Sequence, residues 1–133
     1  MNAQDKYEHW LHIAQYDLET ANTMLSGGRW IYVVFMCQQA VEKLAKGLYI
    51  LYVDDNTPRI HSIRTIIERF EDKLTVAIPE DTYRFFDTLS AYYLNNRYPD
   101  FSGSPNISID ESKATELLKK TREAFAWLLT LKK

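Results

Sequence analysis

Cysteine is almost absent from this chain of 133 residues, which contains one, Cys37. A single thiol cannot form an internal disulfide, so the chain is not a small secreted domain held together by disulfides, and a reducing compartment fits it better. Cys37 lies in the most apolar stretch of the sequence, and we interpret it as a buried structural thiol rather than a nucleophile. The first residues are polar, so we expect no signal peptide and a cytoplasmic protein.

Glycine and proline are also scarce, with four of each. Few residues of these types mean few turns and long regular elements. The sequence has neither an internal repeat nor a useful run of alternating apolar and polar residues, so nothing indicates a β-strand. Its length suits one domain, residues 1–133, that buries its own core without disulfides or metals.

The chain has no excess of basic residues, because 16 lysines and arginines stand against 18 acidic residues and the formal charge is -2. A protein that coats nucleic acid is basic overall, and this one is not. Any contact with nucleic acid or a nucleotide must therefore come from a local patch, which two subunits can build together.

A long apolar run is missing as well. The most apolar stretch begins at Trp30 and stops before Gln38, short of the roughly 18 to 20 residues that a bilayer requires. We therefore predict a buried bundle helix over residues 30–52 and no membrane contact. Glu42, Lys43 and Lys46 lie off the apolar stripe of this helix. They form either a solvated face or a polar groove towards a partner or ligand.

Apolar residues that recur every three or four positions predict four long helices and one short helix. Three long helices cover residues 4–26, 30–52 and 79–96, and the short helix covers residues 62–72. Ser108 is expected to cap the last long helix, with Glu111 completing a capping box. Gly27 and Gly28 end the first helix and leave a short loop, so the first two helices form an antiparallel hairpin. The predicted fold is an all-α, up-and-down bundle of four long helices plus one short helix.

Polar and aromatic residues gather where the helix over residues 79–96 ends. Asn96, Arg97 and Tyr98 follow one another there, and Pro99 prevents the helix from continuing. The guanidinium fork of Arg97 fits a phosphate, and a tyrosine ring offers a face on which a base can stack. The structural alternative is that Arg97 caps the last carbonyl groups of its own helix.

The three histidines are the other candidates for chemistry. His61, at the start of the short helix, is either a hydrogen-bonded surface residue or, beside a suitable partner, a proton carrier. His9 and His12 are three residues apart on one helix, but two ligands without a cysteine or carboxylate cluster do not make a metal site. We expect no metal and no cofactor, and the sequence has none of the common phosphate-loop, dinucleotide or nucleophile-elbow motifs.

Four motifs taken together resemble the HEPN domain, the "higher eukaryotes and prokaryotes nucleotide-binding" domain. Each motif alone is weak, but their order and spacing agree from Trp10 to the last helix, which is almost the whole chain. In chain order the motifs are Trp10 with Ala14-Gln15-Tyr16-Asp17-Leu18 and Ala21, then Gln38-Gln39-Ala40-Val41-Glu42-Lys43-Leu44-Ala45-Lys46, then Pro58-Arg59-Ile60-His61-Ser62-Ile63, and Arg97-Tyr98-Pro99.

The resemblance implies a helical bundle that forms a homodimer, with a polar site near the dimer cleft. It also implies a minimal nucleotidyltransferase as partner protein, often as a toxin–antitoxin pair. Many toxin members of the family are metal-independent ribonucleases that use an arginine, a polar neighbour of it and a histidine a few residues later. This chain departs from that pattern, because Phe101, Ser102 and Gly103 stand where the histidine is expected and no histidine follows His61.

We therefore predict a non-catalytic HEPN subunit that binds a nucleotide or RNA. Two alternatives stay open. In the first, the protein is a ribonuclease in which Arg97 stabilises the pentavalent phosphate while His61 or Tyr98 moves protons. In the second, it is a structural interaction module. The predicted binding residues are Arg97 on phosphate, Asn96 and Tyr98 beside it, and Lys43, Lys46 and His61 as further candidates.

Overall fold

The fold is described from a computed structural model, which places residues 1–97 and 109–133, with side chains described for residues 1–93 and 109–133. The described residues form five α-helices and one short 3-10 helix, and no strand. This confirms the predicted all-α bundle with four long helices. The elements are α1 (Ala3–Ser26), α2 (Trp30–Tyr52), α3 (Ile63–Glu68), η1 (Glu71–Lys73), α4 (Glu80–Arg97) and α5 (Glu111–Leu129).

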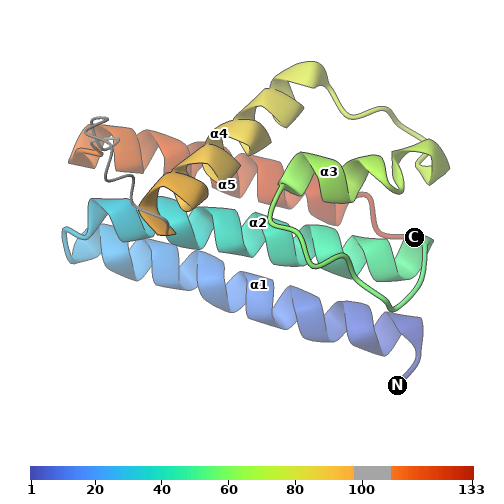
Figure 1. Cartoon of the computed structure of the whole chain (residues 1–133). Coiled ribbons are helices and arrows are strands. Elements are labelled where there is room, and N and C mark those ends of the chain that lie inside the picture. The colour runs from blue at the N-terminus through green and yellow to red at the C-terminus, as the bar shows by residue number, and fades with distance from the viewer. Residues whose placement is uncertain (98–108) are drawn as a thin grey trace.

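The bundle is arranged around α2, which contacts α1, α3, α4 and α5. Figure 1 shows α1 and α2 lying antiparallel side by side, α5 running along α2, and α4 crossing the bundle obliquely. The antiparallel hairpin of α1 and α2 was predicted from Gly27 and Gly28. Gly28 has a φ of 73°, a left-handed conformation that glycine adopts without strain.

A close crossing joins α1 to α2. A Cβ atom at Gly47 would lie 3.2 Å from both the Tyr7 ring and the Trp10 Cβ, so a side chain at this position would push the two helices slightly apart. Tyr7, Ala14 and Ala21 of α1 are buried along the same seam. These three residues are seven positions apart, and a seven-residue repeat of buried positions is typical of helices that pack on each other at a shallow angle.

The burial of α2 differs in part from the sequence expectation. The helix is buried along most of its length, as predicted, but Ile31 is 38% and Tyr32 57% exposed near its start. Of the three polar residues for which a solvated face or a polar groove was left open, Glu42 and Lys46 are buried. The reason is tertiary, because the segment that leads into α3 covers this part of α2 through His61.

Cys37 is fully buried, as predicted, and burial raises the pKa of its thiol to about 11. Among the residues that the structure describes, no helix is both long and apolar enough to cross a membrane.

Two helix ends differ from the sequence expectation. The short helix stops at Glu68 instead of residue 72, and a 3-10 turn, η1, follows it. The last helix begins at Glu111, and the side chain of Asp110 accepts a hydrogen bond from the Lys113 backbone N–H at 2.8 Å. The N-cap is therefore Asp110, which directly precedes the helix, and not the predicted Ser108, which lies outside the described residues.

A salt-bridge cluster holds α4 in its oblique position. Arg64 of α3 lies 2.9 Å from both Glu80 and Asp87 of α4, and its guanidinium lies 4.6 Å from the centroid of the Tyr83 ring. The Tyr83 hydroxyl donates a hydrogen bond to Glu71 of η1. Burial and the Glu71 carboxylate raise the pKa of Tyr83. These contacts fix the helix that carries Tyr93 and ends at Arg97.

Candidate functional site

A cluster of polar side chains lies inside the bundle at the middle of α2. Its centre is the Glu42 carboxylate, which is buried. Glu42 Oε2 accepts a hydrogen bond from Lys46 Nζ at 3.0 Å, and Oε1 accepts one from Gln38 Nε2 at 3.1 Å. His61 Nδ1 lies 3.2 Å from Oε1 and 3.4 Å from Oε2. We call Gln38, Glu42, Lys46 and His61 the Glu42 cluster.

The helical repeat explains how α2 supplies three of the four members. Gln38, Glu42 and Lys46 follow one another at intervals of four residues, which places them side by side on one helix face. His61 comes from the segment before α3, and Gln38 holds that segment by donating a hydrogen bond to the His61 carbonyl at 2.8 Å. The Ser90 hydroxyl of α4 lies 3.5 Å from the same carbonyl oxygen.

Charge inside a bundle is costly unless every charged atom has a partner. Here the carboxylate of Glu42 accepts from the Lys46 ammonium and the Gln38 amide and also contacts His61 Nδ1, so the carboxylate is satisfied. A pair of apolar residues of similar size would often stabilise a fold as well as a buried ion pair does. Stability alone therefore gives little reason for these residues, and the Glu42 cluster is a candidate functional site.

The ring of His61 connects the cluster to α4 and to solvent. Its side chain is 42% exposed, and its ring centroid lies 5.0 Å from that of Tyr93. Tyr93 also stacks on Phe35 of α2 at 5.2 Å. Arg97, the last residue of α4, follows Tyr93 by four residues, which is one helical turn or about 6 Å along the axis.

The structure brings together two of the six predicted site residues, Lys46 and His61. Lys43 points to a different partner, because its Nζ lies 2.6 Å from Oδ2 of the buried Asp17 in α1. Asn96 and Arg97 are the last two residues of α4, but their side chains lie outside the described part of the chain, and so does the whole of Tyr98.

Sequence reasoning missed two members of the cluster as site residues. Glu42 was placed off the apolar stripe of its helix, and Gln38 at the end of the apolar run; both also stand in one of the four family motifs, but neither was named as a site residue. Their four-residue spacing, Gln38-Glu42-Lys46, was the available signal. What the spacing does not reveal is that this face of α2 points inward.

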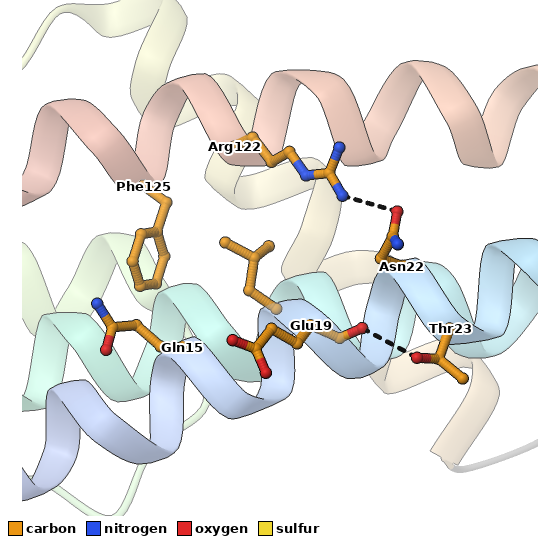
Figure 2. A pocket seen from close by; sticks show the side chains of 7 residues that line it. Gln15, Glu19, Asn22, Thr23, Arg122 and Phe125 are labelled. Atoms are coloured by element: carbon orange, nitrogen blue, oxygen red, sulfur yellow. Dashed lines mark hydrogen bonds between the residues drawn. The ribbon is translucent and has the colours of Figure 1, made fainter.

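A separate hollow of about 660 Å³ lies between α1 and α5, and Figure 2 shows the side chains around it. Arg122 donates a hydrogen bond to Asn22 at 2.7 Å across its end, and the Thr23 hydroxyl donates to the Glu19 carbonyl at 3.3 Å. The hollow contains none of the predicted site residues, and its two charged residues, Glu19 and Arg122, have opposite signs. We regard it as the gap between two helices that both pack on α2.

Within residues 1–93 and 109–133, where side chains are described, no group of three or more histidine, cysteine, aspartate or glutamate side chains is arranged to hold a metal ion. His9 and His12, the pair considered from the sequence, are both exposed on α1.

Comparisons with known proteins agree with the resemblance seen in the four motifs. The model of the HEPN domain matches residues 7–131. The crystal structure of an archaeal HEPN homologue superposes with a TM-score of 0.72 at 28% identity, over 94% of this chain and 96% of that one. The protein TT1696 of Thermus thermophilus gives a TM-score of 0.81 at 26% identity, over 98% of each chain. A search of curated proteins finds no match. Because the domain model covers nearly the whole chain, this protein belongs to the HEPN domain family.

Proposed function

We propose that the protein binds RNA or a nucleotide where α2, α4 and His61 meet. The observation that carries the proposal is the half-exposed ring of His61, fixed by Glu42 on one side and by Tyr93 on the other. Arg97 follows Tyr93 by one helical turn. The guanidinium of an arginine is suited to a phosphate, and the imidazole of His61 to the sugar next to it.

The two lysines have an indirect part in this proposal. Lys43 is paired with Asp17 and Lys46 with Glu42, so neither ammonium is available to a phosphate without breaking an ion pair. Lys46 neutralises Glu42 and thereby keeps the carboxylate in place under His61. Phosphate binding then falls to Arg97, with Asn96 and Tyr98 beside it.

The proposal includes a homodimer and a partner protein. The start of α2 exposes Ile31 and Tyr32, and both lie close in sequence to Phe35, which stacks on Tyr93 at the site. Exposed apolar side chains next to a polar site favour an interface there. A second copy on this face would close the site into a cleft. The family resemblance supports a minimal nucleotidyltransferase as the partner, in a toxin–antitoxin-like pair.

The Glu42–His61 contact also favours a second candidate, a metal-independent endoribonuclease. A carboxylate that orients an imidazole is the usual support for a general base. Arg97 would stabilise the charge that develops on the phosphate. In this candidate, His61 takes the place of the histidine that the chain lacks after Arg97.

The test is binding of a labelled mixed-sequence RNA pool, measured by fluorescence anisotropy for the wild type and for Arg97→Ala. We expect at least about tenfold weaker binding in the variant, because a charged hydrogen bond to phosphate is worth about 1.5 to 3 kcal/mol. Arg84→Ala is the matched control, since Arg84 is on the same helix and 72% exposed. It should bind as the wild type does, and all three proteins should unfold at the same temperature.

The outcomes separate the candidates. Equal binding by Arg97→Ala and the wild type contradicts the proposed site. An absence of any RNA or nucleotide binding, with Arg97→Ala less stable than the wild type, leaves a structural module. Cleavage of the pool in EDTA, abolished in both Arg97→Ala and His61→Ala, establishes the ribonuclease.

The dimer is tested by light scattering of the wild type and of Tyr32→Glu. We expect the wild type to have the mass of a dimer and the variant that of a monomer, because the substitution introduces a charge into the proposed interface.

A further inference from the structure

We propose that Glu42 is a positioning residue: when the His61 imidazole is neutral, Glu42 holds it in the Nδ1–H tautomer, so that Nε2 accepts a hydrogen bond from a ribose 2′-hydroxyl. The inference rests on the proposed function, and it adds the sugar that the site selects. It follows from the donors and acceptors of the Glu42 cluster in three steps.

The first step is the charge of Glu42. Its two oxygens accept from the Lys46 ammonium at 3.0 Å and from the Gln38 amide at 3.1 Å. Both partners are donors with no acceptor atom at the contact, since an ammonium has no lone pair and the amide presents its Nε2. Both oxygens therefore act as acceptors, as in an ionised carboxylate, and no proton is needed on either.

The second step is the tautomer of His61. The Nδ1 atom lies 3.2 Å from a carboxylate oxygen that can only accept, so Nδ1 must carry the proton. A neutral imidazole has one N–H, and its other nitrogen is an acceptor. The ring cannot easily turn away, because Gln38 holds the His61 carbonyl at 2.8 Å and Tyr93 packs against the ring.

The third step is the direction of Nε2. Nδ1 points inward at the buried carboxylate, and the two nitrogens lie on different sides of the ring. The His61 side chain is 42% exposed, and since Nδ1 faces the buried carboxylate, we infer that the edge carrying Nε2 is turned to solvent. In the described part of the chain, every hydrogen bond of His61 is made by Nδ1 or by the backbone carbonyl. Nε2 is left for a ligand.

An acceptor at this place restricts what binds. Phosphate oxygens are acceptors and gain nothing from a second acceptor, whereas the ribose 2′-hydroxyl can donate and is absent from DNA. That hydroxyl is adjacent to the 3′-phosphate, for which Arg97 is the proposed partner. A hydrogen bond between neutral groups contributes about 0.5 to 1.5 kcal/mol, which corresponds to a preference for RNA over DNA of about two- to tenfold.

The first measurement is the tautomer of His61, from a long-range proton–nitrogen correlation spectrum at about pH 9, where an ordinary imidazole is neutral. We expect the Nδ1–H form for His61. His9 and His12 are internal controls, because both are exposed on α1 and should show the Nε2–H form that free imidazole favours. The Glu42→Leu/Lys46→Met double variant should move His61 to the Nε2–H form. A wild-type His61 in the Nε2–H form overturns the inference whatever the variant does.

The second measurement compares three oligonucleotides of one sequence, with ribose, 2′-deoxyribose or 2′-O-methylribose. The methyl ether can accept a hydrogen bond but cannot donate one. We expect the wild type to bind ribose more tightly than both others, and His61→Ala to bind all three equally. If 2′-O-methyl RNA binds as tightly as RNA, the ligand part of the inference is wrong although the proposed function stands. If none of the three binds, the proposed function fails, and the tautomer result still decides the role of Glu42.

Discussion

The ion pair of Glu42 and Lys46 gives the sharpest test of the cluster. The two side chains are 5% and 11% exposed, with 3.0 Å between Nζ and Oε2. Removing one partner of a buried pair leaves the other charge without compensation and costs about 3 to 5 kcal/mol, whereas replacing both by apolar residues is often neutral. Lys46 keeps some contact with water, which favours the lower end of this range.

We therefore expect Glu42→Leu to lower the free energy of unfolding by about 3 kcal/mol. In a chain of this size that corresponds to a melting temperature lower by about 10 °C. Adding Lys46→Met removes the charge that the first substitution leaves unpaired, so the double variant should regain about 2 kcal/mol of the loss. Urea unfolding followed by circular dichroism gives these energies.

An exposed pair on α5 is the matched control. Glu116 and Lys120 have the same four-residue spacing and the same 3.0 Å separation, but their side chains are about half exposed. Glu116→Leu should leave the unfolding midpoint almost unchanged, because solvent screens exposed pairs. The reasoning is refuted if the Glu42→Leu/Lys46→Met variant is no more stable than Glu42→Leu. The unpaired charge of Lys46 would then not be the source of the cost.

Three further predictions concern the scaffold. Cys37 is buried with a pKa of about 11, so a disulfide reagent at neutral pH should modify it only after denaturant is added, and rapid reaction of the native protein would show that the thiol is accessible. Gly47→Leu should destabilise the protein by about 3 kcal/mol in a thermal melt, because a side chain there meets Tyr7 and Trp10 of α1; an unchanged melting temperature would mean that α1 shifts without cost. Asp110→Ala should cost about 1 kcal/mol in urea unfolding, since it removes the N-cap of α5, and no loss would mean that another residue caps the helix.

Most helix positions follow from the sequence alone. The ends of α1, α2 and α4 lie within one residue of the predicted ranges. These elements are long, and their apolar spacing is regular, so the local pattern suffices. The errors lie at helix ends where the local sequence is compatible with more than one boundary. One is the end of α3, and the other is the N-cap of α5, where two good capping residues stand close together.

The site was only partly predictable. His61 and Lys46 were named from the sequence, but Gln38 and Glu42 were not identified as site residues, and Lys43 pairs with Asp17 instead of joining them. A polar residue on an otherwise apolar helix is compatible with both a solvated face and a buried network. Only knowledge of what covers the helix separates the two.

The sequence by itself determined the helices, the tight hairpin of α1 and α2 and the family of the protein. These depend on contacts between near neighbours and on the order of motifs along the chain. Only the tertiary structure decided that Glu42 and Lys46 face inward and that His61 meets a carboxylate 19 residues away. The physical reason is that burial of a charged residue depends on which distant segment packs over it, and no periodicity within one helix specifies that segment.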